Sequence, residues 1–159
     1  FIKCNFENTT FQGIDFENVE IEKSNFSNQN LSNRSLMNTS ISDSNLIGTS
    51  FMDAYLENVS FDCCNLTYTN FSNCKMKYVR FNHCNLEEST FHEVKWKKLE
   101  FNNCDLKKAE FQKTTLKDID FSSCEIEGIK LDISKLNGLI VDYNQAARIS
   151  TMLGIKIKN

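Results

Sequence analysis

Residues 61–90 read FDCCN LTYTN FSNCK MKYVR FNHCN LEEST when they are written in groups of five. Every group begins with a large apolar residue, and the residue two places earlier is small, as at Cys64 and Thr69. A period of five matches neither the helical period of 3.6 residues nor the strand period of two. The pattern therefore indicates a chain that turns a corner every five residues.

The same period runs from Phe1 to Leu131 without a break. Large apolar residues occupy all 27 positions of this register: thirteen Phe, nine Leu, three Ile, Met76 and Trp96. No Phe lies outside it. The residue two places after each large one is often Asn or Gly, the types that best tolerate the positive φ of a tight corner. The absence of proline fits a chain whose backbone N–H groups pair with neighbouring coils.

Four corners close a square coil of twenty residues, so residues 1–133 predict about 6.7 coils. Stacked coils would lie roughly 4.8 Å apart, the spacing of parallel strands. From Leu46 to Phe121 the large residues alternate between Phe and mostly Leu, which predicts Phe ladders on two opposite walls. Gln29 and Arg34 are too long and polar for the small inward register, so we expect a local distortion there.

The four predicted walls differ in charge. The wall that contains Trp96, here the tryptophan wall, has seven basic and four acidic residues, net +3. The opposite wall, here the cysteine wall because it contains Cys64, Cys84, Cys104 and Cys124, has two basic and six acidic residues, net −4. The Phe61 wall sums to −3 and the Phe71 wall to −2. Two adjacent acidic walls on a narrow rod could present a DNA-like potential, or could simply keep the rod soluble.

Six of the seven cysteines fall in the small inward register, and only Cys63 does not. The six are Cys4, Cys64, Cys74, Cys84, Cys104 and Cys124. We expect buried thiols rather than a disulfide framework, because stacked residues have parallel Cβ vectors. The sequence contains no Cys-x₂-Cys spacing, which would indicate a zinc site. An odd number of cysteines, most of them buried thiols, suits a reducing cytoplasm, the predicted location.

Nothing in the sequence predicts an enzyme, a metal site or another cofactor. The two histidines, His83 and His92, are expected to point outward on different walls, and no phosphate-binding loop or nucleophile motif is present. We therefore predict no catalytic residue. No apolar run approaches the roughly 18 residues of a membrane span, and no leader sequence opens the chain. A net charge of −3 and a pI near 5.4 argue against direct binding of nucleic acid.

The register fades after about residue 133, which divides the chain into a β-helix of residues 1–133 and a capping and dimerisation module of residues 134–159. Asp142 is a suitable helix N-cap and Gly154 a suitable stop, and residues 155–158 alternate like a short strand. The module could cap a monomer or join two rods end to end. The predicted dimer interface is Tyr143, Ala146, Ile149, Met152, Leu153, Ile155 and Ile157.

The repeat resembles the pentapeptide-repeat family, whose motif is small, polar, Leu or Phe, any, any. This resemblance implies an all-β solenoid, a right-handed quadrilateral parallel β-helix. The segment with Asp142, Gln145-Ala146 and Leu153-Gly154-Ile155 is similar to the C-terminal end of Qnr-type and MfpA-type fluoroquinolone-resistance proteins. That similarity implies a homodimer that mimics DNA, binds DNA gyrase, with topoisomerase IV as a further target, and protects it from quinolones. Many Qnr proteins have loops that interrupt the register, and this chain has none between Phe1 and Leu131.

The acidic walls supply the predicted gyrase-binding residues, which are Asp62, Glu87, Glu88, Glu100, Asp105, Asp120, Glu125 and Glu127. The alternative is a general protein-interaction scaffold or immunity factor with an unrelated partner. In that case the basic surface around Lys95, Lys97 and Lys98 could form the contact.

Overall fold

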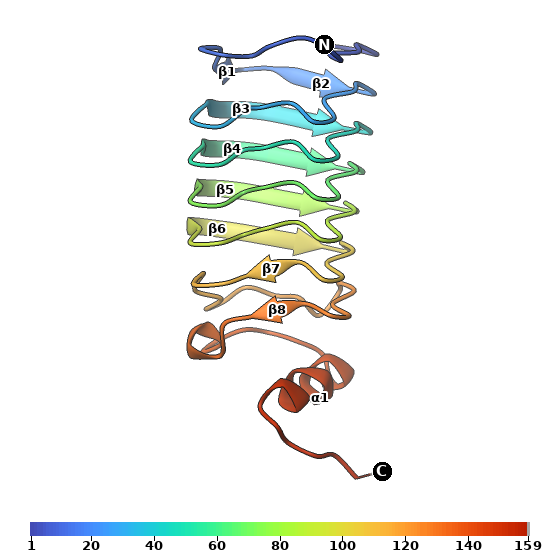
Figure 1. Cartoon of the computed structure of the whole chain (residues 1–159), viewed down its shortest axis with the longest axis vertical. Helices are drawn as coiled ribbons and strands as arrows, with labels where there is room; N and C mark the ends of the chain where they lie inside the picture. Colours follow the sequence, from blue (N-terminus) through green and yellow to red (C-terminus); the bar gives the residue numbers. More distant parts are fainter. Residues whose placement is uncertain (159) are drawn as a thin grey trace.

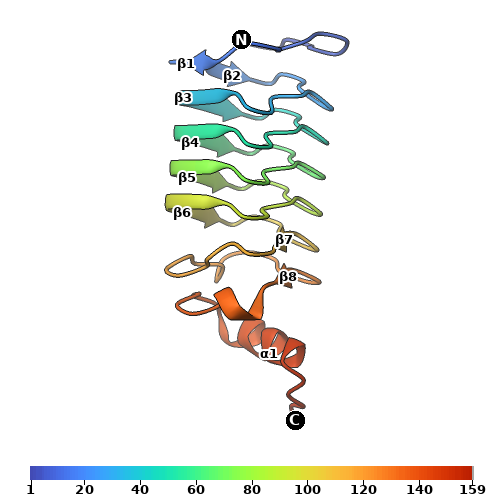
Figure 2. The same ribbon diagram turned by 60° about the vertical axis from the view of Figure 1, so that its left-hand side comes forward.

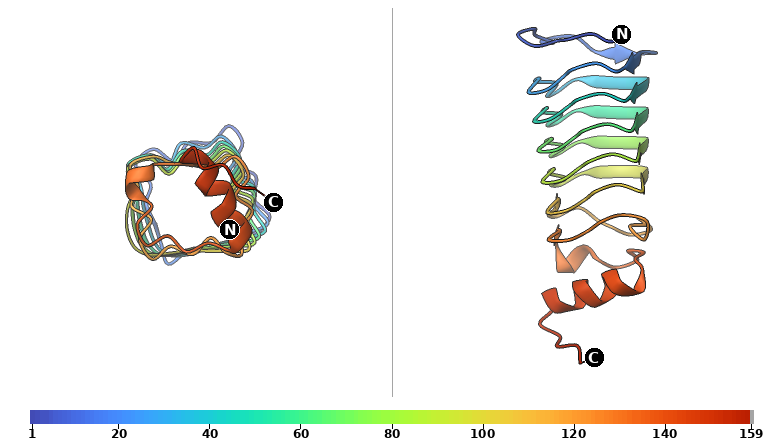
Figure 3. Two further views of the ribbon diagram at one scale, coloured as in Figure 1. Left: turned by 90° about the horizontal axis from the view of Figure 1, so that it is seen from below. Right: turned by 90° about the vertical axis from the view of Figure 1, so that its right-hand side faces the viewer.

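The computed structural model describes residues 1–158 and shows a parallel β-solenoid that ends in a short helix (Figure 1). Viewed along the stack, the coils trace a nearly square outline (Figure 3). Every paired residue lies twenty positions from its partner in the next coil, as with Leu56 and Met76. The predicted square coil is therefore confirmed. No helix among residues 1–158 is long and apolar enough to cross a bilayer.

The main sheet lies on two adjacent walls. It contains β1 (Phe16–Glu17), β2 (Glu20–Glu22), β3 (Ser35–Ser42), β4 (Tyr55–Asp62), β5 (Lys75–Asn82) and β6 (Lys95–Asn102). Each of the four longer strands runs along the tryptophan wall, turns the corner and continues along the Phe61 wall (Figure 2). A smaller sheet pairs β7 (Glu110–Phe111) with β8 (Lys130–Leu131). The other walls are held by single bridges and turns between coils.

The corners lie at the position two residues after each large apolar residue. All 24 such positions from Lys3 to Asp118 have a positive φ, 22 of them in residues other than Gly. Asn occupies only eight of the 24, and even Tyr68 and Tyr78 take φ values of 59° and 54°. Closure of the coil thus imposes the left-handed conformation on residues that do not favour it.

The large residues fill the interior as predicted. Of the 27, 24 are buried, whereas Phe1 is exposed and Phe6 and Trp96 are partly buried. Two Phe ladders form, and five successive pairs from Phe51 to Phe111 stack at 4.7–5.2 Å between ring centroids. The two ladders meet edge to face, as Phe71 and Phe81 do at 5.6 Å and 74°. Both arrangements are favoured by the quadrupole of the rings.

The small inward residues add a second set of contacts between coils. Thr49 Oγ1 donates to the Phe26 carbonyl at 2.8 Å, and Cys74 Sγ donates to the Phe51 carbonyl at 2.9 Å. Gln29 makes the equivalent bond with its longer side chain, to the Phe6 carbonyl at 2.9 Å. Backbone hydrogen bonds between coils continue through Gln29 and Arg34. The expected local distortion was therefore wrong, because the polar end of Gln29 finds a carbonyl inside the coil.

The hydrogen-bonded coil continues past residue 133, since the Phe121 N–H donates to the Ile140 carbonyl at 2.9 Å. A 3₁₀ turn, η1 (Ile133–Lys135), interrupts this last coil. The helix α1 (Tyr143–Met152) then lies across the open end of the solenoid (Figure 3). Asp142 is its N-cap, and Gly154 follows its end with φ 77°. Residues 155–158 pair with no other described segment, so the short strand predicted there does not form within this chain.

Candidate protein-binding walls and the capped end

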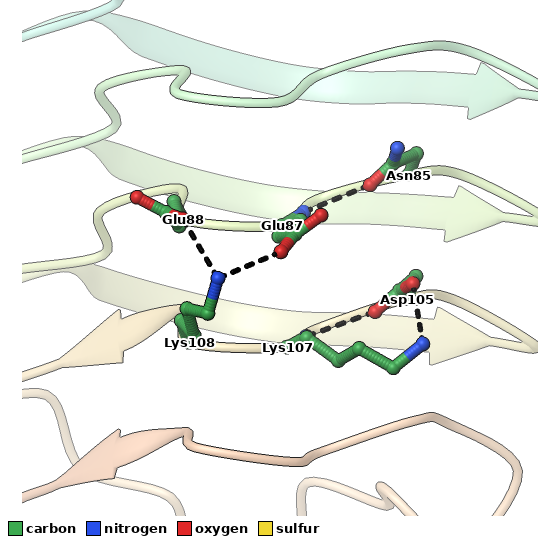
Figure 4. A network of polar contacts seen from close by, with 6 residues as sticks. All are labelled: Asn85, Glu87, Glu88, Asp105, Lys107 and Lys108. Carbon is green, nitrogen blue, oxygen red and sulfur yellow. Dashed lines mark hydrogen bonds and ion pairs between the residues drawn. The ribbon is translucent and has the colours of Figure 1, made fainter.

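Three of the predicted acidic residues are engaged by lysines on the cysteine wall (Figure 4). Lys108 Nζ lies 3.1 Å from a carboxylate oxygen of Glu87 and 3.1 Å from one of Glu88. Lys107 Nζ lies 3.0 Å from Asp105. All three carboxylates are half-buried. Between residues 84 and 108, this wall is therefore less negative than its count of acidic residues indicates.

A second group of carboxylates is exposed and lies toward the helical end. Glu100 and Asp120 line one hollow of about 370 Å³ on the Phe61 wall, together with Asp118. Hydrogen bonding to Ser122 holds the pKa of the Asp120 carboxyl below its ordinary value, so this group stays ionised. Asp118 is not among the predicted residues, because its register places it at the corner of the tryptophan wall.

Glu125 and Glu127 continue this negative surface onto the lower cysteine wall. Asp105 and Glu125 are bridge partners in successive coils. Glu127 has one long ion pair, at 3.9 Å to Arg148 of α1. Asp62 lies well apart from this group, and its carboxylate accepts a hydrogen bond from Asn82 at 2.6 Å. The structure thus brings together Glu100, Asp118 and Asp120 in one hollow and leaves Asp62 outside the surface.

The tryptophan wall is densely basic across β5 and β6. Lys75 is the register partner of Lys95, and Lys77 is the partner of Lys97. Trp96 lies between the two lysines of β6 and is only half-buried, so the prediction that it points fully inward was wrong. Its indole Nε1 donates to the Thr115 carbonyl at 2.8 Å. The indole is larger than the buried Met76 side chain that precedes it in the stack, and β6 is the last strand of this sheet.

The solenoid is closed by Gln145, whose side chain is buried. In the preceding coils the backbone N–H of Asp105 donates to the Cys84 carbonyl and that of Glu125 to the Cys104 carbonyl. At the equivalent place in the next coil, Gln145 Nε2 donates to the Cys124 carbonyl at 2.7 Å. Nε2 also donates to the Phe121 carbonyl at 2.8 Å. One side-chain amide therefore satisfies carbonyls that another coil would otherwise cover.

Gln145 also belongs to the helix cap. Its Oε1 accepts from the Asp142 N–H at 2.9 Å, and its own N–H donates to the Asp142 carboxylate at 2.8 Å. This is a capping box with Gln at the third helical position. The same residue thus begins the helix and ends the coil.

The outer side of the capped end is apolar. Ile149 is buried against the last coil, so its assignment to a dimer interface was wrong: it packs within its own chain. The other predicted interface residues are exposed, and Ile133 and Ile140 add to the apolar surface. The exposed ones are Tyr143, Ala146, Met152, Leu153, Ile155 and Ile157.

The thiols follow the predicted register. Cys64, Cys74, Cys84, Cys104 and Cys124 are buried and free, Cys4 is partly buried and Cys63 is exposed. Burial raises the pKa of the Cys74 thiol to about 12. His83 is exposed, and the His92 imidazole lies 3.4 Å from the Glu93 carboxylate. Within residues 1–158, no group of three His, Cys, Asp or Glu residues could hold a metal ion.

Family models agree with this geometry. A pentapeptide repeat region model matches residues 42–111, and a pentapeptide repeats model matches residues 1–33 and 100–138. The chain is a pentapeptide-repeat protein. No curated protein matches this pentapeptide-repeat protein.

Several solved structures share the fold. A pentapeptide repeat protein from the thylakoid lumen of Arabidopsis thaliana has 19% identity and a TM-score of 0.52, with 66% of each chain covered. HetL, from the cyanobacterium Nostoc sp. strain PCC 7120, has 13% identity and a TM-score of 0.53, with 89% of this chain and 90% of HetL covered. A trypsin-treated variant of QnrB1, a plasmid-mediated fluoroquinolone resistance protein, has 19% identity and a TM-score of 0.43, with 99% and 97% covered. At these identities the first two similarities show a common fold alone and say nothing about function.

Proposed function

We propose that this protein binds DNA gyrase as a mimic of DNA and protects the enzyme from quinolones. The observation that carries the proposal is the exposed acidic surface toward the helical end, where the hollow of Glu100, Asp118 and Asp120 lies on the wall next to Glu125 and Glu127. A narrow rod with ionised carboxylates on two adjacent walls is complementary to a positively charged groove that normally holds DNA.

The arrangement of these carboxylates argues for a partner. Glu100 and Asp120 are twenty positions apart and line the same hollow. Like charges on directly neighbouring strands repel, whereas acidic residues that only maintain solubility can be placed beside lysines. Glu93 with Lys113, and Glu110 with Lys130, show this second arrangement on the Phe71 wall. The acidic surface retains repulsion that a bound cationic groove would relieve.

We also propose that the protein forms a homodimer through its helical end. Tyr143 is 88% exposed, and Met152 and Leu153 are also exposed beside residues 155–158. Apolar side chains exposed to water at one end of a chain often belong to a contact surface, and a second rod would cover them by two-fold symmetry. Two rods joined in this way would form a rod of roughly 60–70 Å at the coil spacing of about 4.8 Å, with one acidic surface on each half.

The test of the proposed function is gyrase supercoiling with and without ciprofloxacin. We expect the wild-type protein to restore supercoiling in the presence of the drug, and the double variant Asp120→Lys, Glu125→Lys to fail. The matched control is Glu110→Lys on the Phe71 wall, which should protect like wild type. Absence of both relief and gyrase binding at a large excess of wild-type protein would refute the proposal.

The dimer is tested separately by analytical ultracentrifugation at micromolar concentration. Wild type should sediment as a dimer and Met152→Asp as a monomer, because the charge would be buried without a partner. The exposed Met52, on a wall of the rod, provides the control Met52→Asp, which should remain dimeric. A monomeric wild type would exclude the end-to-end contact.

A scaffold for an unrelated protein is the second candidate, favoured by the basic surface of β5 and β6. Gyrase pull-down separates the two functions, since the scaffold would not retain gyrase. In neither case do we propose an enzymatic activity.

A further inference from the structure

The tryptophan wall has a concentrated positive surface that the gyrase proposal does not use. Six exposed lysines lie within three successive coils on this wall. They are Lys75, Lys77, Lys95, Lys97, Lys98 and Lys117. The side chains project from a flat part of the solenoid, because the β5 and β6 backbones are paired in register beneath them.

Most of these charges have no acidic partner. Of these six lysines, only Lys77 lies within ion-pair distance of a carboxylate in the described chain, at 3.7 Å from Glu57. Lys97 Nζ lies 5.5 Å from the centre of the Tyr78 ring, a contact that positions the ammonium group without neutralising it. The surface therefore differs from the lysines of the cysteine wall, where Lys107 and Lys108 are bound to carboxylates.

The lysines also face one another. Lys75 with Lys95, and Lys77 with Lys97, are direct register partners on neighbouring parallel strands, and Lys117 continues the second column twenty residues later. Like charges directly opposite each other destabilise a sheet. On the same two strands the register places Arg80 opposite Glu100, so the fold permits opposite charges at facing positions. A bound anion would relieve the repulsion between these facing lysines, so the arrangement is typical of an anion-binding surface.

The charge density indicates which anion fits. Three coils span about 10 Å along the rod, given two spacings of roughly 4.8 Å. A DNA duplex has one phosphate per about 1.7 Å of axis, or about six per 10 Å, which equals the number of lysines. An extended acidic peptide rises about 3.3 Å per residue and offers only about three charges over the same length. A duplex is therefore the better match.

We propose that the tryptophan wall binds the phosphate backbone of double-stranded nucleic acid. Lysine ammonium groups are compact donors suited to phosphate oxygens without reading base sequence. The net charge of −3, which argues against a nucleic-acid binder for the chain as a whole, is a sum over four walls, and the largest acidic excess lies on the opposite wall. The proposal does not depend on gyrase binding, since it concerns a different wall.

Trp96 makes the proposal directly measurable. It is the only tryptophan of the chain, and it lies half-exposed between Lys95 and Lys97. Trp96 lines a hollow of about 780 Å³ with Lys75, Lys95, Lys113 and Lys117, and the acidic residues Asp53, Glu93 and Asp118 line the same hollow. A duplex bound to this wall should change the intrinsic tryptophan fluorescence, whereas a duplex bound elsewhere on the rod should not.

The experiment titrates wild-type protein with a fluorescein-labelled duplex of about 20 base pairs at salt concentrations from about 50 mM to 200 mM. Anisotropy of the label measures binding, and quenching of Trp96 measures its location. For six neutralised phosphates, log K should fall against log salt with a slope of about −5. The double variant Lys95→Gln, Lys97→Gln should weaken binding roughly tenfold or more at the lowest salt and reduce the magnitude of the slope by about 2.

The control is Lys107→Gln, Lys108→Gln, which removes the same charge from the cysteine wall and should leave affinity and slope unchanged or slightly increase the affinity. Circular dichroism checks that both variants fold. The proposal is overturned by no duplex binding at the lowest salt, by equal weakening in both variants, or by binding without a change in Trp96 fluorescence. Binding of poly-glutamate but not of the duplex would also overturn it and would favour an acidic protein partner.

Discussion

Replacement of Gln145 by Met should destabilise the whole protein, because the change removes the amide and keeps a side chain of similar length. The variant loses the Nε2 bonds to the Phe121 and Cys124 carbonyls, at 2.8 Å and 2.7 Å, inside the last coil. The Phe121 carbonyl keeps a bond from the Cys124 N–H, whereas the Cys124 carbonyl loses its only donor in the described chain. The accepting half of the capping box at the Asp142 N–H is lost as well.

These losses can be added to an order of magnitude. A net hydrogen bond contributes about 1 kcal/mol, and a buried carbonyl left without a donor costs about 1–3 kcal/mol. Weakening the helix cap adds roughly 0.5–1 kcal/mol. We expect the free energy of unfolding to fall by about 3 kcal/mol. With a urea m-value of about 2–3 kcal/mol per M, the midpoint should fall by about 1–1.5 M.

The assay is urea unfolding followed by circular dichroism, with Asn144→Ala as the matched control on the exposed side of α1. The control should shift the midpoint little. Gln145→Glu is a second informative variant, because an ionised carboxylate accepts hydrogen bonds but cannot donate them. It should be at least as unstable as Gln145→Met near neutral pH. A midpoint within about 0.2 M of wild type for Gln145→Met would refute the view that this amide closes the solenoid.

Four other predictions concern the core, the corners and the thiols. Phe81→Ala should lower the free energy of unfolding by about 3–5 kcal/mol in urea, whereas Phe1→Ala should change it by less than about 0.5 kcal/mol, because Phe81 is fully buried and Phe1 is 52% exposed. Tyr68→Asn should stabilise the protein by roughly 0.5–1 kcal/mol in thermal unfolding, because Asn tolerates the φ of 59° better; a lower melting temperature would contradict this. Ellman's reagent should modify the exposed Cys63 rapidly and the five buried thiols only on unfolding, and rapid modification of several thiols would exclude the buried column. Burial raises the pKa of Cys74 from 9.0 to about 12, so the native state favours the thiol, and stability should fall as the pH rises above about 9, measured by urea unfolding at successive pH values.

The pentapeptide register made the fold predictable in unusual detail. In each group of five, one inward position must hold a large apolar residue, and the inward position two places earlier must hold a small one. Because these requirements recur every five residues, the sequence pattern predicts the shape of each coil. The Phe ladders and the exposure of Cys63 followed directly from it. The expected distortion at Gln29 failed because the pattern reports size and polarity and does not show that a carbonyl lies within reach of the amide.

The candidate sites were less predictable. Glu87, Glu88 and Asp105 were assigned correctly to an acidic wall, but lysines engage their charges in a way that depends on side-chain geometry. Asp118 was missed because its side chain lines a hollow on the wall next to the one its register assigns.

The repeat determined the number of residues per turn, the contents of the core and the direction of each side chain. It could do so because every coil is under the same steric constraint as its neighbours. The end of the solenoid was not, because no repeat describes the place where repetition stops. There, Gln145 replaces the donors of an absent coil and Ile149 turns into its own chain, leaving the rest of the apolar stripe outside. Which charges remain free was likewise decided by contacts between residues twenty positions apart, where distances of a few ångströms determine whether a carboxylate is paired or available.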